Sequence, residues 1–442
     1  MTADNVDSRL ARRLGLFDAV VIGLGAMIGA GVFAALAPAA RAAGSGLLVG
    51  LGIAAAVAYC NATSSAQLAA VYPQSGGTYV YGRERLGGLW GYLAGWGFIV
   101  GKTASCAAMA LTFGAYASPE WRRPLAVAAV VALTAVNYHG VRKTAWLTRL
   151  IVAVVLASLT AVVAAALLGG QASTDNLGPL TAESGWSGIL ESGGLLFFAF
   201  AGYARLATLG EEVVDPARTI PRAIPLALGI ALVVYAAVAA SALLAAGPDA
   251  LAGSSAPLAT AVEAGDVDAV APVVRVGGTV AALGVLLSLI VGVSRTAFAM
   301  AANGELPRWL DAVHPVHRIP HHAELAVGAL VAAVVLAADL RGAIGFSSFA
   351  VLTYYGIANA SAWTLAAEQR RWPRWLAGLG VIGCAILAFT LPTVSVVTGA
   401  SMLGIGAVIW TVRRVSARRG SRSGLPVSPS AGSRPDGYRD RS

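Results

Sequence analysis

The first candidate for binding chemistry is a glycine-rich stretch near the N-terminus. Residues 21–33 read VIGLGAMIGAGVF and place Gly23, Gly25, Gly29 and Gly31 within an apolar run of about 16–43. Each glycine costs a helix interior about 1 kcal/mol relative to alanine, so a segment that only crosses a bilayer has no need of four. Glycine permits an irregular backbone and the close approach of a ligand. The sequence therefore predicts an interrupted helix here.

A second stretch, FFAFAGY at 197–203, predicts a matching interruption. Unpaired backbone N–H and C=O groups in a membrane cost several kcal/mol each unless a partner satisfies them. A zwitterionic ligand is such a partner, because its carboxylate accepts from the half-helix that begins near Gly29. Its ammonium donates to carbonyls released at Ala26, Met27 and Ile28 and at 200–202. Helix packing is the alternative for the first stretch, because Gly25 and Gly29 form a G-x-x-x-G pair.

Three basic residues, Lys102, Arg205 and Arg295, lie inside apolar segments. Ionisable side chains at membrane depth are functional candidates by default. Lys102 either exchanges a proton during transport, because burial disfavours its charged form, or donates to carbonyls freed by the helix breaks. Arg205 either caps the second broken helix or pairs with an acid one to two turns on. Arg295 lies near a helix end, where a long side chain can extend to the membrane surface.

Charged residues on the expected cytoplasmic face are candidates for a salt-bridge gate. They are Arg83 and Glu84 after the second span, and Glu211 and Glu212 after the sixth. Solvated charge that only sets the membrane orientation is the alternative interpretation. All five histidines also fall in expected cytoplasmic loops, and the run HPVHRIPHH at 314–322 has no tight metal-ligand spacing. We therefore expect no metal site and no cofactor.

The composition indicates a membrane protein. Of 442 residues, 57% are hydrophobic and 12% charged, whereas soluble domains average about 25% charged residues. Apolar runs of about 18 or more residues, each able to cross ~30 Å of hydrocarbon, recur along the chain. The expected fold is an all-α integral membrane protein with about 12 transmembrane helices, at 16–43, 46–71, 89–117, 124–138, 146–169, 188–209, 223–246, 269–302, 323–338, 343–366, 375–391 and 393–412.

The distribution of basic residues predicts the orientation. With a cytoplasmic N-terminus and an even number of spans, most of the 31 Lys and Arg residues lie in the cytoplasm, as the positive-inside rule requires. The net charge of +9 therefore needs no nucleic-acid partner. The expected organisation is a cytoplasmic segment at 1–15, a ten-helix core at 16–366, two further helices at 375–412 and a basic, disordered cytoplasmic tail at 413–442.

Four stretches resemble motifs of one transporter family. They are GLGAMIGAGVF at 23–33, YPQSGGTYVYGRERLGGLWGYLAGW at 72–96, FFAFAGYARLATLGEEVVDPARTIPRAI at 197–224 and SRTAFAMAANGELPRWLDAVHPVHRIPHHAE at 294–324. Together they resemble the amino acid-polyamine-organocation (APC) superfamily, in its bacterial amino acid permease and cationic amino acid transporter-like branch. They span helices one to nine at the right spacing, so the match is specific at the level of the family.

This resemblance implies a core of two inverted five-helix repeats, alternating access, and an amino acid held by broken helices 1 and 6. Ala30 stands where many relatives have a hydroxyl residue, which leaves only backbone donors there. Val155 stands where some relatives place a lysine on helix 5, and we hypothesise that Lys102 supplies that ammonium from helix 3. By position, the substrate-binding residues are Ile28, Gly29, Ala30, Gly31, Phe200, Ala201 and Gly202, with Tyr203 as an aromatic gate.

The acidic residues bear on the substrate. None of the 22 Asp and Glu residues falls near the middle of an expected span, and burying a cationic side chain without a carboxylate partner is costly. The expected function is therefore a secondary active transporter for an amino acid, with a neutral substrate first and an anionic one second. The alternatives are an exchanger for charged amino acids or polyamines, and an amino acid sensor that does not transport.

An enzyme is not expected, because the deep titratable groups are basic residues, Tyr and Cys rather than paired carboxylates or a nucleophile with its base. The expected partners are an amino acid substrate, the lipid bilayer and, as a candidate coupling ion, the proton. Uniport, exchange and proton symport are all compatible with the residues, and no oligomeric state is predicted. The expected location is the cytoplasmic membrane, with both termini in the cytoplasm.

Overall fold

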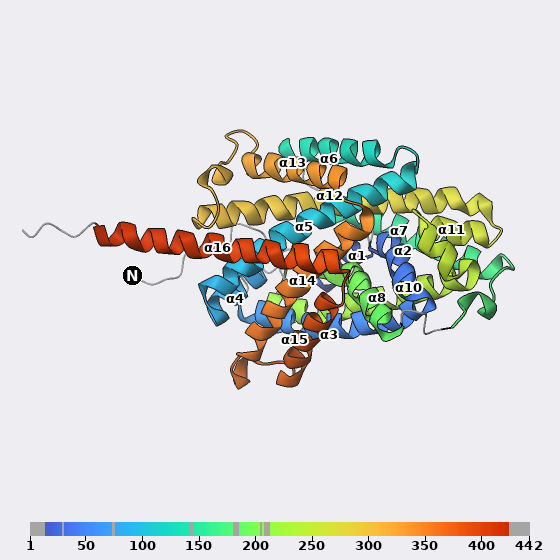
Figure 1. The fold of residues 1–442 in the computed structure, drawn as a ribbon, viewed down its shortest axis with the longest axis horizontal. Helices are drawn as coiled ribbons and strands as arrows, with labels where there is room; N and C mark the ends of the chain where they lie inside the picture. The colour runs from blue at the N-terminus through green and yellow to red at the C-terminus, as the bar shows by residue number, and fades with distance from the viewer. Residues whose placement is uncertain are drawn as a thin grey trace, which may run out of the picture.

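The computed structural model describes residues 14–28, 31–72, 76–140, 145–179, 185–203, 206 and 213–423. These residues are almost entirely helical, and the described part contains no strand beyond one isolated parallel bridge between Leu14 and Val213 (Figure 1). The α-helices are α1 Leu16–Met27, α2 Gly31–Ala43, α3 Leu47–Val71, α4 Thr78–Leu86, α5 Gly88–Ala117, α6 Arg122–Tyr138, α7 Ala145–Leu168, α8 Gly185–Phe200, α10 Pro216–Gly253, α11 Pro257–Ala264, α12 Ala271–Ala302, α13 His321–Ala337, α14 Leu340–Trp363, α15 Arg374–Phe389 and α16 Thr393–Ser423.

Short 3₁₀ turns link several of these helices. They are η1 Gly44–Gly46, η2 Thr174–Leu177, η3 Ala201–Tyr203, η4 Asp268–Val270, η5 Arg308–Asp311 and η6 Ala367–Gln369. Helix α10 contains a kink at Gly247, whose φ of 72° lies in the left-handed region that glycine adopts without a steric penalty. The chain leaves α10 after this kink and continues into α11.

Among the residues that the structure describes, six helical segments are long and apolar enough to cross a bilayer. They are Gly31–Val71, Gly88–Ala117, Trp146–Leu168, Arg218–Gly253, Asp268–Ala302 and Thr393–Val415. A span needs about 20 residues at 1.5 Å each, so α6, α13 and α15, with 16 or 17 residues, are short by this measure. A described helix overlaps each expected span. The helical, multi-pass architecture is thus confirmed, while the count of twelve and the inverted repeat stay predictions.

Both expected interruptions occur. Helix α1 ends at Met27, where the N–H of Ile28 still donates to the carbonyl of Leu24 at 2.7 Å, and α2 begins at Gly31. Helix α8 ends at Phe200 and passes directly into the tighter turn η3. The glycine-rich sequence of the first stretch and the Ala-Gly pair of the second lower the helical preference at these points. The two breaks lie on helices that pack together, because α2 packs against α8 and α1 against η3.

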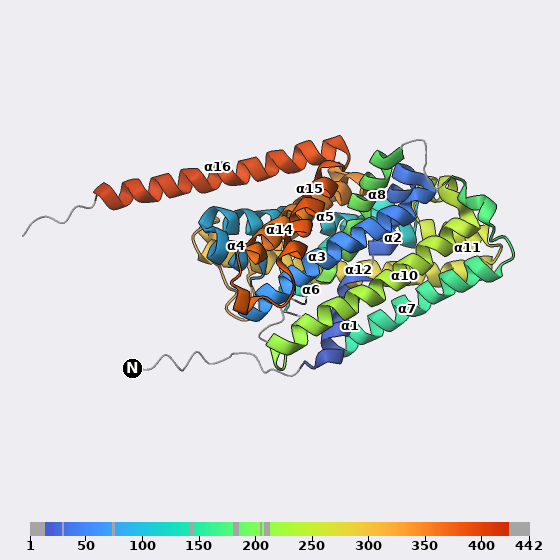
Figure 2. The same ribbon diagram turned by 90° about the horizontal axis from the view of Figure 1, so that it is seen from below.

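The remaining helices surround these four segments. Helix α5 packs against α12 and α14, α6 packs against α13, and α3 packs against α8, α10 and α15. The molecule has two ends: the α11 end, which carries η2 and α11, and the α4 end, which carries α4 and η5 (Figures 1 and 2). Helix α16 runs along one side and extends beyond the body at the α4 end (Figure 2). Its apolar segment, Thr393–Val415, is the least buried of the six segments that are long enough to cross a bilayer.

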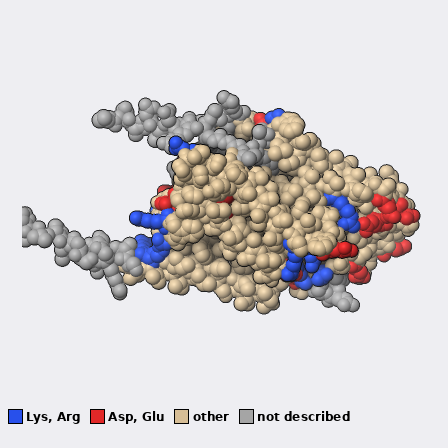
Figure 3. Space-filling view, turned by 90° about the horizontal axis from the view of Figure 1, so that it is seen from above, with Lys and Arg blue, Asp and Glu red and all other residues tan. Residues whose placement is uncertain are grey.

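Charge differs between the two ends. Figure 3 shows most of the visible acidic side chains gathered at the α11 end, with basic side chains beside them, and a further cluster of basic side chains at the opposite end. Helix α16 runs from Thr393 to Ser423, and its Arg413 donates to the carbonyl of Glu305 at 3.2 Å at the α4 end. The expected tail at 413–442 thus begins as helix rather than as a disordered segment, and residues 424–442 lie outside the described part. Arginine favours helix about as strongly as leucine does, which accounts for the extension.

Candidate functional site

The two helix breaks touch each other backbone to backbone. A methyl group added at Gly202 would overlap the carbonyl group of Ala26 and lie 2.7 Å from the amide nitrogen of Met27. A methyl group added at Gly31 would lie 2.5 Å from Cα and 2.8 Å from Cβ of Ala199. Such separations are too short for any side chain. Glycine is therefore required at both crossings, which explains why each stretch places one there.

Aromatic side chains bury the second break. Phe200 and Tyr203 are fully buried. The ring of Tyr203 stacks on Tyr355 of α14 at 4.9 Å between centroids, with 26° between the planes. Phe200 meets Tyr235 of α10 edge to face at 5.1 Å, and the Tyr235 hydroxyl donates to the carbonyl of Ala199 at 3.0 Å. Sequence reasoning did not identify Tyr235 or Tyr355. Tyrosines inside otherwise apolar spans were the available signal.

Lys102 reaches the same break from α5. Its side chain is buried, and Nζ lies 3.5 Å from the carbonyl oxygen of Ala201 in η3. The hydroxyl of Tyr355 donates to that oxygen at 3.2 Å. No carboxylate of the described residues forms an ion pair with Lys102. The contact agrees with the interpretation that Lys102 donates to a carbonyl freed by a helix break, and it leaves the proton-exchange hypothesis a prediction.

The space next to the first break is small. A void of about 10 Å³ lies between α1 and α7, lined by Leu24, Gly25 and Ile28 on one side and by Ile151, Val152 and Val155 on the other. This volume holds about one water molecule. Val155, which stands where some relatives of the resemblance carry a lysine, faces this void with an apolar side chain. The residues that line this void thus enclose a volume far smaller than an amino acid.

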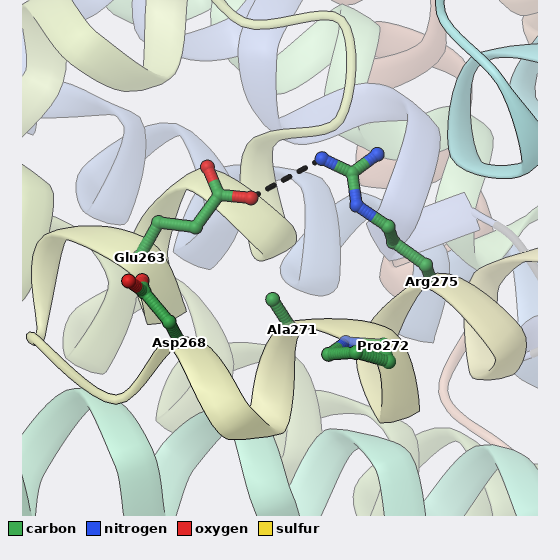
Figure 4. Close-up of a pocket in the computed structure, with 5 residues that line it drawn as sticks. All are labelled: Glu263, Asp268, Ala271, Pro272 and Arg275. Carbon is green, nitrogen blue, oxygen red and sulfur yellow. Dashed lines mark hydrogen bonds and ion pairs between the residues drawn. The ribbon is translucent and has the colours of Figure 1, made fainter.

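The α11 end is closed by a short helix. The hydroxyl of Tyr116 on α5 donates to the carbonyl of Phe33 in α2 at 3.3 Å and accepts from the N–H of Leu258 in α11 at 3.3 Å. One buried phenol thus connects three elements. A hollow of about 430 Å³ lies beside α11, lined by Glu263, Asp268, Ala271, Pro272 and Arg275, with an ion pair of 3.2 Å between Glu263 and Arg275 (Figure 4).

The α4 end carries a polar cluster that includes one of the predicted gate residues. Arg83 pairs with Glu305 at 3.6 Å and donates to the hydroxyl of Tyr79 at 3.0 Å. The same hydroxyl accepts from Asn303 at 3.1 Å. Burial raises the pKa of Glu305, and hydrogen bonding from Tyr79 and the charge of Arg83 partly offset that rise. Sequence reasoning missed Glu305 because it lies about 220 residues from Arg83 in the chain.

Some of the other predicted site residues lie within the described part of the chain and some lie outside it. Glu84 is exposed and forms no ion pair within the described ranges. Ala26, Met27, Ile28, Gly31 and residues 200–203 meet at the breaks as described above. The remaining predicted site residues, Gly29, Ala30, Arg205, Glu211 and Glu212, lie outside the described residues.

The histidines form one cluster at the α4 end. The rings of His314 and His317 lie 4.7 Å apart, and His314 and His321 lie 5.3 Å apart. Tyr138 at the end of α6 contacts all three, as well as His139. Within the described ranges no three His, Cys, Asp or Glu residues are placed to hold a metal ion. Desolvation, followed by the charges of His317 and His321, lowers the pKa of His314.

Apolar helices with two backbone breaks that touch each other are typical of membrane transporters. The family model of the amino acid permeases matches residues 14–412. The chain therefore belongs to the amino acid permease family, within the superfamily that its motifs resemble. It is a multi-pass membrane protein and a transporter, not an enzyme.

Relatives of this chain cover nearly its whole length. An uncharacterized transporter of Mycobacterium tuberculosis is 63% identical over 415 residues, which is 94% of each chain. The branched-chain amino acid permease of Bacillus subtilis is 25% identical, over 93% of this chain and 94% of its own. The crystal structure of the manganese transporter of Eremococcus coleocola matches with a TM-score of 0.59 at 14% identity, over 95% of this chain and 99% of its own. The last match concerns the fold alone.

Proposed function

We propose that this protein is a secondary active transporter for a neutral amino acid, which it carries across the cytoplasmic membrane by alternating access. The observation that carries this proposal is the direct contact between the two helix breaks at Gly202 and Ala26. Two broken helices that cross at the centre of a membrane bundle are the arrangement in which transporters place their substrate sites. In the proposed orientation the α4 end and both termini face the cytoplasm, as the basic charge at that end favours.

The breaks supply the groups that an amino acid needs. Helix α2 begins at Gly31 and presents the positive end of its dipole toward a substrate carboxylate. The carbonyls of residues 200–202 and of Ala26 to Ile28 are the proposed acceptors for the substrate ammonium. Both sets are backbone groups, so they recognise the common part of an amino acid and not its side chain.

The charges near the breaks favour a neutral substrate. The described residues of the two breaks include no acid, and Lys102 is the charged side chain that contacts them. Asp18 is paired with Arg149, and Glu191 with Arg341 at 2.6 Å. The other buried charge of the described residues, Glu324, sits at the start of α13, which packs against α5, α6 and α12. A cationic substrate side chain at the breaks would thus meet the like charge of Lys102, and the described residues of the breaks offer it no carboxylate.

Lys102 is the proposed coupling residue. Its ammonium is buried against a carbonyl of the broken helix, and burial disfavours the charged form. A lysine in this position can release and regain a proton as its surroundings change during the transport cycle. The printed name of the Bacillus subtilis relative, a branched-chain amino acid permease, agrees with a neutral substrate.

The test is transport by purified protein in liposomes. Labelled alanine, leucine, glutamate and arginine are compared, each with an inward proton gradient, an outward one and none. We expect flux of alanine or leucine that responds to the gradient in the wild type and that ignores the gradient in Lys102→Gln. Arginine transported faster than the other three overturns the neutral substrate. Gradient-sensitive flux in Lys102→Gln overturns the coupling role.

A further inference from the structure

The carbonyl oxygen of Ala201 has two donors. Lys102 Nζ lies 3.5 Å from it, and the hydroxyl of Tyr355 donates to it at 3.2 Å. A carbonyl oxygen accepts through two lone pairs, so these two donors use its full capacity. In the conformation described here this carbonyl therefore has no lone pair left for a substrate.

The two donors are held with different firmness. Tyr355 stacks on Tyr203, meets Phe197 edge to face at 5.8 Å and meets Tyr354 edge to face at 5.2 Å. Its ring is thus fixed on three sides. Lys102 has a flexible four-carbon stem, and 3.5 Å is longer than a normal N–H···O hydrogen bond. The lysine is the donor that an incoming group displaces more easily.

A substrate ammonium that takes this lone pair also repels the lysine. Two ammonium groups at one acceptor, in a buried site without a carboxylate, strongly disfavour each other. A neutral lysine amine removes this repulsion, and its nitrogen lone pair can then accept a hydrogen bond from the substrate ammonium. The number of ammonium groups at this acceptor stays the same, because one replaces the other, and the net charge of the site falls by one, because the bound zwitterion is neutral overall and the Lys102 proton has left.

We propose that the substrate ammonium and the Lys102 ammonium compete for the Ala201 carbonyl, so that binding of an amino acid expels the Lys102 proton to water. The proposal rests on the proposed function and fixes its mode: the protein exchanges an amino acid for a proton. The proton leaves Lys102 on the side where substrate binds, and a proton from the other side returns to Lys102 when substrate leaves. Tyr355 is the positioning residue. Its hydroxyl occupies the second lone pair of the Ala201 carbonyl oxygen, so the substrate ammonium and Lys102 are left with a single lone pair between them.

Other titratable groups near Lys102 do not replace it in this role. Cys106 lies one turn further along α5, Tyr355 of α14 donates to the same carbonyl, Tyr203 of η3 stacks on Tyr355, and Glu324 on α13 interacts electrostatically with Cys106. Phenols and thiols are ordinarily neutral near pH 7, because their unperturbed pKa values are about 10 and about 8.5. Glu324 forms no ion pair with Lys102. Substrate-linked proton release is therefore assigned to the lysine.

The experiment measures protons and binding together. Purified full-length protein in weakly buffered detergent solution is mixed with alanine or leucine and a pH indicator, and binding is measured by calorimetry at several pH values. We expect about one proton released per bound amino acid, and an affinity that falls up to tenfold per pH unit as Lys102 becomes protonated. Binding that takes up a proton, or that exchanges none, overturns the inference and leaves the proposed function intact. No binding of either amino acid overturns the proposed function and the inference with it.

Two tyrosine variants form a matched pair. Tyr355→Phe frees one lone pair on the Ala201 carbonyl, so only the mutual repulsion of the two ammonium groups still favours loss of the Lys102 proton, and we expect proton release below that of the wild type. Tyr235→Phe removes a similar buried hydroxyl that donates to the neighbouring carbonyl of Ala199, and we expect it to keep the wild-type release. Equal release in the two variants overturns the role of Tyr355. Lys102→Gln is expected to bind substrate with no proton release and no dependence of affinity on pH.

Discussion

Replacing Gly202 by alanine directly perturbs the crossing of the two broken helices. The added methyl would overlap the Ala26 carbonyl group and lie 2.7 Å from the Met27 nitrogen. All of these atoms are backbone, so no side chain can rotate away to make room. The backbone segments at η3 and at the end of α1 must therefore move apart by roughly 1 Å to reach ordinary van der Waals distance.

The magnitude follows from the cost of overpacking. Inserting a methylene-sized group into a packed interior costs about 1–3 kcal/mol, which corresponds to roughly a 5- to 150-fold change in an equilibrium constant. This cost falls on conformations in which the breaks touch, and it is relieved in conformations in which they separate. We expect Gly202→Ala to lower the melting temperature and to slow amino acid exchange by a factor in that range.

The control is a glycine that has room for a side chain. Gly229 on α10 is exposed, and a methyl group there meets nothing within 4 Å. Gly229→Ala should keep wild-type transport and gain about 0.5–1 kcal/mol from helix propensity. Exchange rates in liposomes and melting curves of purified protein compare the two variants. If Gly202→Ala matches Gly229→Ala in both measurements, the close crossing of the helix breaks is refuted.

Three further predictions follow from the contacts at the two ends. Tyr116→Phe leaves the N–H of Leu258 without its acceptor, so α11 should loosen by about 1–3 kcal/mol, measured as faster labelling of a cysteine introduced next to it; unchanged labelling contradicts this. The lowered pKa of His314 means that acid favours the protonated unfolded chain, so the loop around it should lose stability as the pH falls below 6.5. The amides of Val316 and His317 donate to its Nδ1 and should then exchange hydrogen faster at pH 5.5 than at pH 7.5, and equal rates contradict the assignment. Arg83→Gln removes an ion pair whose arginine side chain is 45% exposed. The free energy of unfolding should therefore fall by at most about 1 kcal/mol, with little change in melting temperature. A large drop in melting temperature would show instead that the pair holds the α4 end together.

The sequence predicted the helices and the positions of both breaks because these are local properties. Hydrophobic length predicts a span, and the glycines of residues 21–33 together with the Ala-Gly pair at 201–202 predict where a helix fails. The partners across helices were not predictable in this way. Lys102, Ala201 and Tyr355 are separated by about 100 and 150 residues along the chain, and hydrophobic periodicity carries no information on which spans become neighbours.

Residue type alone also did not identify the acid that pairs with Arg83. Glu84 has the charge that a gate needs, yet it is exposed, whereas Glu305 is the acid that Arg83 reaches. The sequence places both acids in segments that are expected to be cytoplasmic and does not distinguish between them. Only the packing of α4 against its neighbours and the position of the segment after α12 determine which one is close.

The crossing of Gly31 over Ala199 has a mechanical consequence. Helix α2 has 13 residues and is therefore a rod of about 20 Å, supported near one tip at Gly31. If α2 tilts as a rigid body by about 10° on this fulcrum, its far tip near Ala43 sweeps roughly 3.5 Å. A tilt that leaves the contact at Gly31 intact thus moves the other tip of α2, at the α11 end, by a distance comparable to the width of a methyl group. Because Gly31 is the first residue of α2, almost the whole helix is the moving arm, and a substrate bound at the breaks, as proposed above, would act on the α11 end through it.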